Sequence, residues 1–448
     1  MRRLGGGFRE CRKFVSHAGK VQPGAKRNTL PSPTQLALVA TPLGAKIAGM
    51  RRALMILWLL GSAAAAPTIA AREVEIPPAA TVAVAFDRAR IRPVLAEGFA
   101  DRATGRAATA DDPVRIASIS KLITALGVMR LVDAGVLDLD RDVSGYLGWR
   151  LRNPAFPDTP ITLRLLLSHQ ASLLDGADEY VIPLGETLQG RLAAPHVWDA
   201  AHAPGSGGFH YANMNFPVVA SVIEAAAGER FDRVMQARVF RPLRLDACFN
   251  WSGCSPRAIR RAVVLYRSTG EVARDDLRGA PPSCIVVPAA DGTCDLAGYR
   301  PGTNGSLFSP QGGVRISMRD LARIGRMLAR RGKGFVSEHS YAEMTRIQWS
   351  GANGVDEEGQ TGGVFCAYGL GLHRIGTRGA GCRDDLFGDG LARIGHSGEA
   401  YGLRSGLWLD PASGRGVAFF TSAVPDDEPN GRSGFTVREE AVVERAVR

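Results

Sequence analysis

The sequence predicts an α+β fold in which one antiparallel sheet, built from both chain ends, is flanked by helices and carries an inserted helical subdomain. Strand-like runs lie near both ends of the chain, at residues 81–99 and 403–422. Apolar residues recur at helical spacing between them, first over residues 118–132. We find no internal repeat and no long linker, so residues 72–448 are expected to form a single domain, with the helical subdomain at about 136–300.

The first half of the chain carries strand signals and then helix signals. Residues 81–99 form two apolar runs around an Arg-rich turn, which is typical of paired antiparallel strands. Residues 161–167 have helical spacing, and Thr162 is expected to cap that helix. Two further helices are expected before a glycine or a proline ends them, over residues 218–227 and 231–239.

In the second half of the chain, the sequence predicts loops, then a helix, and then two strands with a closing helix. Residues 250–312 are rich in Gly, Pro and Cys, which indicates loops held by disulfides. Ser317 is expected to cap an amphipathic helix that runs through Leu328. The remaining predicted elements are two strands and a closing amphipathic helix, at 403–409, 416–422 and 435–447.

The N-terminal segment has the pattern of an export signal. Residues 50–71 combine a basic start at Arg51 and Arg52, a short apolar run and small residues suited to cleavage. The apolar run is shorter than the roughly 20 residues of a membrane-spanning helix. Residues 1–49 lack periodicity, as expected of a disordered or mistranslated leader. The protein is therefore expected to be exported, either periplasmic or secreted, with an uncleaved signal anchor as the alternative.

The positive net charge belongs mainly to this leader. The whole chain has a formal charge of +11, but residues 1–52 hold eleven of the basic side chains and a single acid, Glu10. The remaining residues are therefore close to neutral, which gives no reason to expect a nucleic-acid partner. A small-molecule ester, amide or peptide substrate is the expected partner, and no obligatory protein partner is inferred.

Six cysteines beyond the leader favour three disulfides, as in exported proteins. They fall into three pairs that are local in sequence, Cys248 with Cys254, Cys284 with Cys294, and Cys366 with Cys382. These local pairings are favoured among the fifteen connectivities that six cysteines allow.

No metal site and no cofactor is expected. The rival reading of the cysteines is a zinc site, and it is disfavoured because no C-x-x-C spacing occurs. The histidines His196, His202 and His210 lie in a Gly/Pro/Ala-rich loop and are read as surface or packing residues rather than as metal ligands.

A lysine is conspicuous at position 121. From Arg72 onward the chain has 42 arginines but only two lysines, Lys121 and Lys333. Lysine loses its proton readily when buried and can then act as a base, whereas arginine stays charged. Ser118 precedes Lys121 by three residues at a helix start, so both side chains share one face near the positive end of the helix dipole. This pair predicts a nucleophile with its base; Ser120 points elsewhere.

Five segments in chain order resemble the serine β-lactamase and penicillin-binding superfamily, in its class C and esterase-like branch. They cover the nucleophile helix, the two stretches that follow it, a Tyr-x-Asn element and a His-x-Gly element in place of Lys-Thr-Gly. In this sequence they are 115–121, 137–147, 161–169, 210–213 and 395–398. The resemblance as a whole covers about residues 80–425.

The resemblance implies roles for single residues. Ser118 would be acylated, with Lys121 and a Tyr211 phenolate relaying protons. The oxyanion would be held by the backbone N–H groups of Ser118 and Glu399. His169 would hold a loop. The residues that would contact substrate are Asn213, His396, Ser397 and Gly398.

The third motif influences the expected substrate. A histidine at position 396 is mostly neutral at pH 7, and the charge of Glu399 would oppose an anionic substrate tail. The sequence therefore predicts an exported serine hydrolase, an esterase acting on neutral esters or amides. The alternative enzymes are a D-alanyl-D-alanine carboxypeptidase or a weak β-lactamase. From another class, the chain would be an acylated binding or sensor module without turnover.

Overall fold

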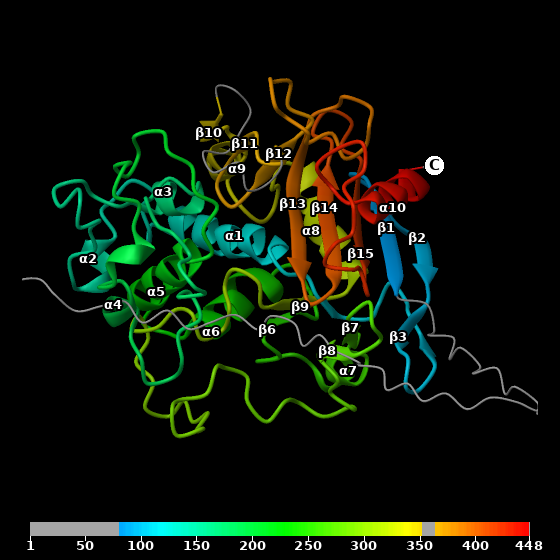
Figure 1. Cartoon of the computed structure of the whole chain (residues 1–448), viewed down its shortest axis with the longest axis horizontal. Coiled ribbons are helices and arrows are strands. Elements are labelled where there is room, and N and C mark those ends of the chain that lie inside the picture. The colour runs from blue at the N-terminus through cyan, green and yellow to red at the C-terminus, as the bar shows by residue number, and fades with distance from the viewer. Residues whose placement is uncertain (1–79, 352–362, 448) are drawn as a thin grey trace, which may run out of the picture. The chain divides into compact units, whose positions relative to one another are not determined.

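The computed structural model describes residues 80–351 and 363–447, and Figure 1 traces their helices and strands. The predicted leader at 1–49 and the predicted signal peptide at 50–71 lie outside the described residues.

The central feature is an eight-stranded antiparallel sheet that joins the two ends of the chain. The N-terminal strand β1 lies between the C-terminal strand β15 and β2, with Thr81 opposite Thr421 and Phe86 opposite Gly416. The strand order is β10-β11-β12-β13-β14-β15-β1-β2. The strands are β1 (Thr81–Phe86), β2 (Ile91–Glu97), β10 (Trp349–Ser350), β11 (Ala367–Tyr368), β12 (His373–Ile375), β13 (Arg393–Ala400), β14 (Leu403–Leu409) and β15 (Gly416–Thr421). The prediction of one antiparallel sheet built from both chain ends is therefore confirmed.

A helix covers each face of this sheet. Helix α8 (Met318–Ala329) packs against β1, β14 and β15, while α10 (Val437–Val447) contacts β1 and β15 from the other side (Figure 1). The Ser317 hydroxyl accepts a hydrogen bond from the backbone N–H of Asp320, so it caps α8 as predicted.

The helical part inserts between the strands of the two ends. Its elements are α1 (Ile119–Asp133), α2 (Ser144–Leu147), α3 (Leu163–Leu167), α4 (Leu188–Arg191), η1 (Pro195–Val197), α5 (Asn215–Ala227), α6 (Phe231–Met235), η2 (Gln236–Phe240) and α7 (Pro256–Arg260), while α9 (Glu338–Thr345) follows α8. Short strands accompany them: β3 (Phe99–Asp101), β4 (Arg106–Ala107), β5 (Val114–Arg115), β6 (Cys248–Phe249), β7 (Leu265–Tyr266), β8 (Val272–Arg274) and β9 (Val314–Ile316). The Thr162 hydroxyl accepts from the N–H of Leu165, which confirms the predicted cap of α3.

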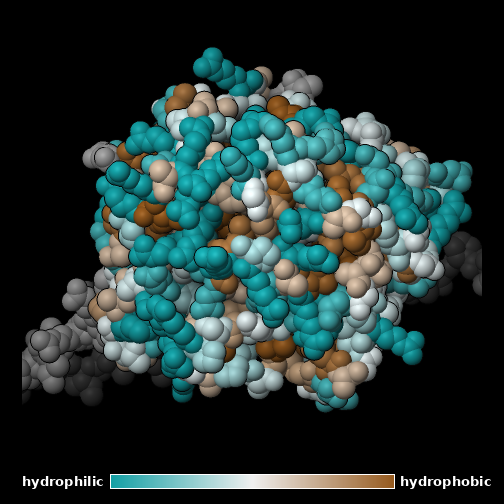
Figure 2. All heavy atoms as spheres, turned by 180° about the vertical axis from the view of Figure 1, so that it is seen from behind, coloured by the Kyte–Doolittle hydropathy of each residue, from teal (hydrophilic) through white to brown (hydrophobic). Residues whose placement is uncertain are grey.

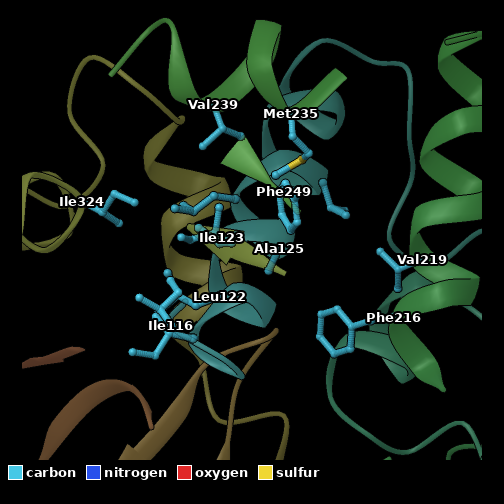
Figure 3. Packing of buried hydrophobic residues seen from close by; sticks show 14 of the residues in the cluster. Ile116, Leu122, Ile123, Ala125, Phe216, Val219, Met235, Val239, Phe249 and Ile324 are labelled. Carbon is cyan, nitrogen blue, oxygen red and sulfur yellow. The ribbon is translucent and has the colours of Figure 1, made fainter. Parts of the chain in front are cut away.

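Helix α1 lies at the centre of the molecule, between the sheet and the other helices. Its side chains are buried almost all round, and Figure 3 shows Leu122, Ile123 and Met235 in the cluster around it. A Cβ added at Gly127 would lie 2.4 Å from the sulfur of Met235, so glycine lets α6 approach closely. Helix α1 is therefore held by packing along most of its length, which fixes the position of its first turn.

The segment 250–312 is more structured than the predicted loops, because α7, β7 and β8 lie within it. Disulfides join Cys248 to Cys254, Cys284 to Cys294 and Cys366 to Cys382, as predicted. The face in Figure 2 is covered mainly by hydrophilic side chains, with apolar ones scattered among them. Among the described helices, none combines the length and the apolar character needed to span a bilayer.

Candidate active site

The first turn of α1 brings Ser118 and Lys121 together. The residue before them, Ala117, has a φ of 47°, so the chain enters the helix through a left-handed turn. Ser118 stands at the N-cap position, but its hydroxyl caps no backbone N–H. It accepts a 2.9 Å hydrogen bond from the Nζ of Lys121 instead. The pair is therefore not a capping serine followed by a solvated lysine.

The environment of Lys121 favours a basic amine. Its side chain is fully buried, and burial lowers its pKa to about 7, while the charge of Asp175 opposes that shift. A substantial fraction of the amine is therefore neutral near pH 7 and able to accept a proton from Ser118. Ser120 is also buried, and its hydroxyl accepts from the N–H of Val314, so Ser120 holds β9 rather than facing the site.

Asn213 links Lys121 to an acid that sequence analysis missed. Its Oδ1 accepts from the Nζ of Lys121 at 2.7 Å, and its Nδ2 donates to Asp175 at 2.8 Å. The second carboxylate oxygen of Asp175 accepts from the N–H of Met214 at 2.9 Å. Asp175 lies 38 residues before Asn213, so no local spacing could have indicated this contact. The carboxylate fixes the orientation of the Asn213 amide and partly balances the charge of Lys121.

Tyr211 lies close to both Ser118 and Lys121, and the Nζ of Lys121 is 4.7 Å from the centroid of its ring. Its ring stacks on Phe365 with centroids 4.4 Å apart, and its hydroxyl forms a hydrogen bond with that of Ser118. Burial raises the pKa of Tyr211 above its ordinary value, so the resting side chain is a neutral phenol. Desolvation therefore opposes the phenolate that the resemblance implies for Tyr211. Burial thus makes the Lys121 amine easier to deprotonate and keeps the Tyr211 phenol protonated.

His169 is structural, as predicted. It has a φ of 59°, and its Nδ1 accepts from the N–H of Ala212 at 3.2 Å. Its ring lies 4.6 Å from that of Tyr211, centroid to centroid, so it supports the segment that carries Tyr211 and Asn213.

Strand β13 brings Gly398 against the nucleophile. A Cβ at Gly398 would lie 2.3 Å from the carbonyl oxygen of Ile116 and 3.2 Å from the backbone nitrogen of Ser118. Only glycine allows this approach, which places β13 next to the backbone N–H of Ser118, one of the two predicted oxyanion donors. Ser397, Gly398 and Glu399 all line a cavity beside Ser118.

Two predictions about the third motif need correction. His396 is fully buried: one ring nitrogen lies 2.8 Å from the hydroxyl of Tyr368, the other 2.6 Å from the carbonyl oxygen of Ser397, and the ring lines neither cavity at Ser118. Because a carbonyl only accepts, the second nitrogen carries the proton, and burial lowers the pKa of His396 well below its usual value. The ring is neutral as expected. It is buried behind the residues that line the cavities, in contact with Tyr368 and Ser397, and it is not placed to contact substrate. Glu399 does not face substrate as an isolated charge either, because it forms an ion pair with Arg404.

Two cavities meet at Ser118. One, of about 380 Å³, also contains Asn213 and Arg115 in its wall. The other, of about 580 Å³, contains Tyr211 and Phe365. Glu399 lines both. A substrate whose carbonyl lies at Ser118 can therefore extend in two directions.

A histidine cluster lies in the segment just before Tyr211. Asp199 bonds to the Nδ1 of His202 at 2.7 Å and to the Nε2 of His210 at 2.6 Å, whereas His196 lies beside Glu179. The three ligand-type atoms of Asp199, His202 and His210 lie within 4.8 Å of one another. Asp199 also accepts from the N–H of Ala201, so the cluster ties the loop before Tyr211 together.

Comparison with known proteins identifies the family. Residues 74–440 match the family model described as Beta-lactamase. Esterase EstB of Burkholderia gladioli is 33% identical over 34% of this chain and 42% of its own length. Penicillin-binding protein 4 of Amycolatopsis lactamdurans is 28% identical over 60% of this chain and 72% of its own. The match with EstB thus spans less than half of that relative.

The fold agrees with that assignment. The crystal structure of the D-amino acid amidase of Ochrobactrum anthropi SV3 with D-phenylalanine aligns with a TM-score of 0.55 at 20% identity. It covers 83% of this chain and 93% of the amidase chain. The chain therefore belongs to the beta-lactamase family.

Proposed function

We propose that this member of the beta-lactamase family hydrolyses small esters or amides through an acyl-enzyme on Ser118. The observation that carries the proposal is the 2.9 Å hydrogen bond between the Ser118 hydroxyl and the buried Lys121 amine. A serine needs a base to act as a nucleophile near neutral pH, and a lysine whose pKa is lowered to about 7 supplies one.

The proposed reaction follows from where each proton lies. The neutral Lys121 takes the proton of Ser118 as its oxygen attacks the substrate carbonyl, and the N-terminus of α1 stabilises the developing charge. The neutral Tyr211 gives its phenol proton to the leaving group. The proton held by Lys121 then restores the phenol, so the net transfer runs from nucleophile to leaving group. Water attacks the acyl-enzyme by the same proton path in reverse.

The positions of Tyr211 and Asn213 assign a direction to the substrate. The leaving group must reach Tyr211, which lines the 580 Å³ cavity and not the 380 Å³ one. The acyl portion then lies in the 380 Å³ cavity, beside Asn213.

An esterase is the first choice, and support comes from the partial similarity to Esterase EstB. The second candidate is a D-alanyl-D-alanine carboxypeptidase, and the partial similarity to the D-alanyl-D-alanine-carboxypeptidase/endopeptidase AmpH of Escherichia coli supports it. The predicted preference for neutral substrates loses its basis, because His396 does not face the substrate and Glu399 is paired with Arg404. Export to an oxidising compartment is part of the proposal, and the three disulfides support it.

The test is a substrate panel with an active-site variant. Purified protein is assayed with 4-nitrophenyl esters, nitrocefin and D-Ala-D-Ala peptides, with S118A as the control. We expect ester turnover that S118A abolishes, together with an acyl adduct that peptide mass spectrometry places on Ser118. An adduct on another residue, or full turnover by S118A, would refute the mechanism. An adduct that forms and never turns over would identify the sensor module instead.

A further inference from the structure

The wall of the 380 Å³ cavity contains a buried cation without a counter-ion. Arg115 on β5 is only 8% exposed, and within the described chain its side chain has no hydrogen bond and no ion pair. Its Nε is fully buried and has no partner. A buried guanidinium without an acceptor is costly, and proteins normally avoid it unless a ligand completes the site.

The carboxylate nearest to this region, Asp275, already has an ion-pair partner. Asp275 feels the charge of Arg115, but it forms its ion pair with the neighbouring Arg315 at 2.9 Å and accepts from the indole N–H of Trp251. Burial and the charge of Arg315 lower the pKa of Arg115 to about 9, so it is still a cation at pH 7. The positive charge of Arg115 therefore remains available to something inside the cavity.

A second arginine approaches the same place from another strand. Tyr401 has a φ of 56° in the turn after β13, and its ring lies 5.1 Å from the guanidinium of Arg115 and 5.4 Å from that of Arg274. Arg274, an exposed residue at the end of β8, also lines the cavity, and its side chain has no hydrogen-bond or ion-pair partner in the described part of the chain. The ring holds two cations near each other despite their repulsion.

The other polar groups of this wall agree with a polar ligand. The Oε1 of Gln311 is buried without a partner in the part of the chain that the structure covers, and Gln311 lines the cavity. The acid in the same lining is Glu399, which forms an ion pair with Arg404. The two unpaired arginines thus dominate the charge of this cavity.

We propose that the 380 Å³ cavity binds a substrate acyl group that ends in a carboxylate, which Arg115 and Arg274 receive. This inference rests on the proposed acyl-enzyme function and narrows its substrate to monoesters or monoamides of dicarboxylic acids. Guanidinium groups bind carboxylates through two parallel hydrogen bonds, so the pair provides both attraction and a fixed direction for the acyl chain.

The test compares substrates that differ only in charge at the far end. They are the mono-4-nitrophenyl esters of adipic and pimelic acid and the corresponding methyl 4-nitrophenyl diesters, and the release of 4-nitrophenol is followed. We expect wild type to prefer the monoester in kcat/KM by at least about tenfold, the scale of a charge-assisted hydrogen bond. R115Q should lower that ratio by about tenfold, and R274Q should also lower it. R115K should keep part of it, because the charge remains without the planar fork.

A matched control lies just after β8, the strand that ends at Arg274. Arg278 is 86% exposed and lines neither cavity at Ser118, so R278Q should keep the wild-type ratio. Thermal unfolding of each variant checks its fold, and R274Q decides the question if R115Q does not fold. A wild type that does not prefer the monoester, or a ratio that R115Q and R274Q leave unchanged, overturns the inference.

A binding experiment separates this inference from the proposed function. S118A cannot be acylated at residue 118, so calorimetry can compare its affinity for adipic acid monoamide and for neutral hexanamide. Tighter binding of the monoamide supports the carboxylate site even if wild type hydrolyses none of the esters, a result that would contradict the proposed function alone. Equal binding of the two amides contradicts the carboxylate site.

Discussion

Replacing Gly398 with alanine tests whether the approach of β13 to the nucleophile determines activity. The added Cβ would lie 2.3 Å from the Ile116 carbonyl oxygen and 2.5 Å from the Ser405 hydroxyl. Real Cβ atoms keep at least 3.0 Å from such atoms, so the strand and the segment before Ser118 must separate by about 0.7 Å. Misplacement by about 1 Å at a reacting centre costs on the order of a hundredfold in rate. We therefore expect kcat/KM to fall by roughly 30- to 100-fold, chiefly through kcat.

The assay is hydrolysis of a short 4-nitrophenyl ester, with thermal unfolding measured alongside. Overpacking of this kind costs about 1–3 kcal/mol of stability, so some loss of stability is expected as well. Gly298 is the control, because nothing lies within 4 Å of the Cβ position there, and G298A should match wild type. If folded G398A keeps more than half of the wild-type kcat/KM, close packing of β13 on the nucleophile is not required and the oxyanion assignment loses its support.

The remaining predictions concern the base, its partner and the disulfides. The pKa of Lys121 is lowered to about 7 and the neutral amine is the active form, so kcat/KM should rise with pH through about 7; a profile that falls over that range would contradict Lys121 as the base. Lys121→Arg should reduce activity by about 10²–10⁴-fold, the worth of a general base, whereas Lys333→Arg, at an exposed turn, should leave it unchanged. Asp175→Asn removes the charge that raises the pKa of Lys121, so the acidic limb should move to lower pH while kcat falls; a limb that moves upward would show that Asp175 does not act on Lys121. Thiol titration of the denatured, unreduced protein should find none of the six cysteines beyond residue 72 free, and several free thiols would contradict the disulfides.

The sequence alone determined the features that depend on short-range geometry. Ser118 and Lys121 share a face because residues three apart on a helix always do, and the scarcity of lysine drew attention to them. The caps at Thr162 and Ser317 and the three disulfides were predictable for the same reason, because each joins residues close in sequence. The pairing of the strands at both chain ends followed from hydrophobic patterning, which tertiary packing did not override.

Only the tertiary structure decided what surrounds each of these groups. His396 was expected to contact substrate, but Tyr368 from another strand lies at its ring, and no local pattern reveals which side of a strand is covered. Asp175 accepts a hydrogen bond from Asn213, 38 residues away. Among the residues that the structure describes, Arg115 has no ion-pair partner, because Asp275 pairs with Arg315 instead. Burial, pKa and the availability of a charge depend on contacts between distant segments, whereas the identity of the nucleophile and its base depends on one turn of helix.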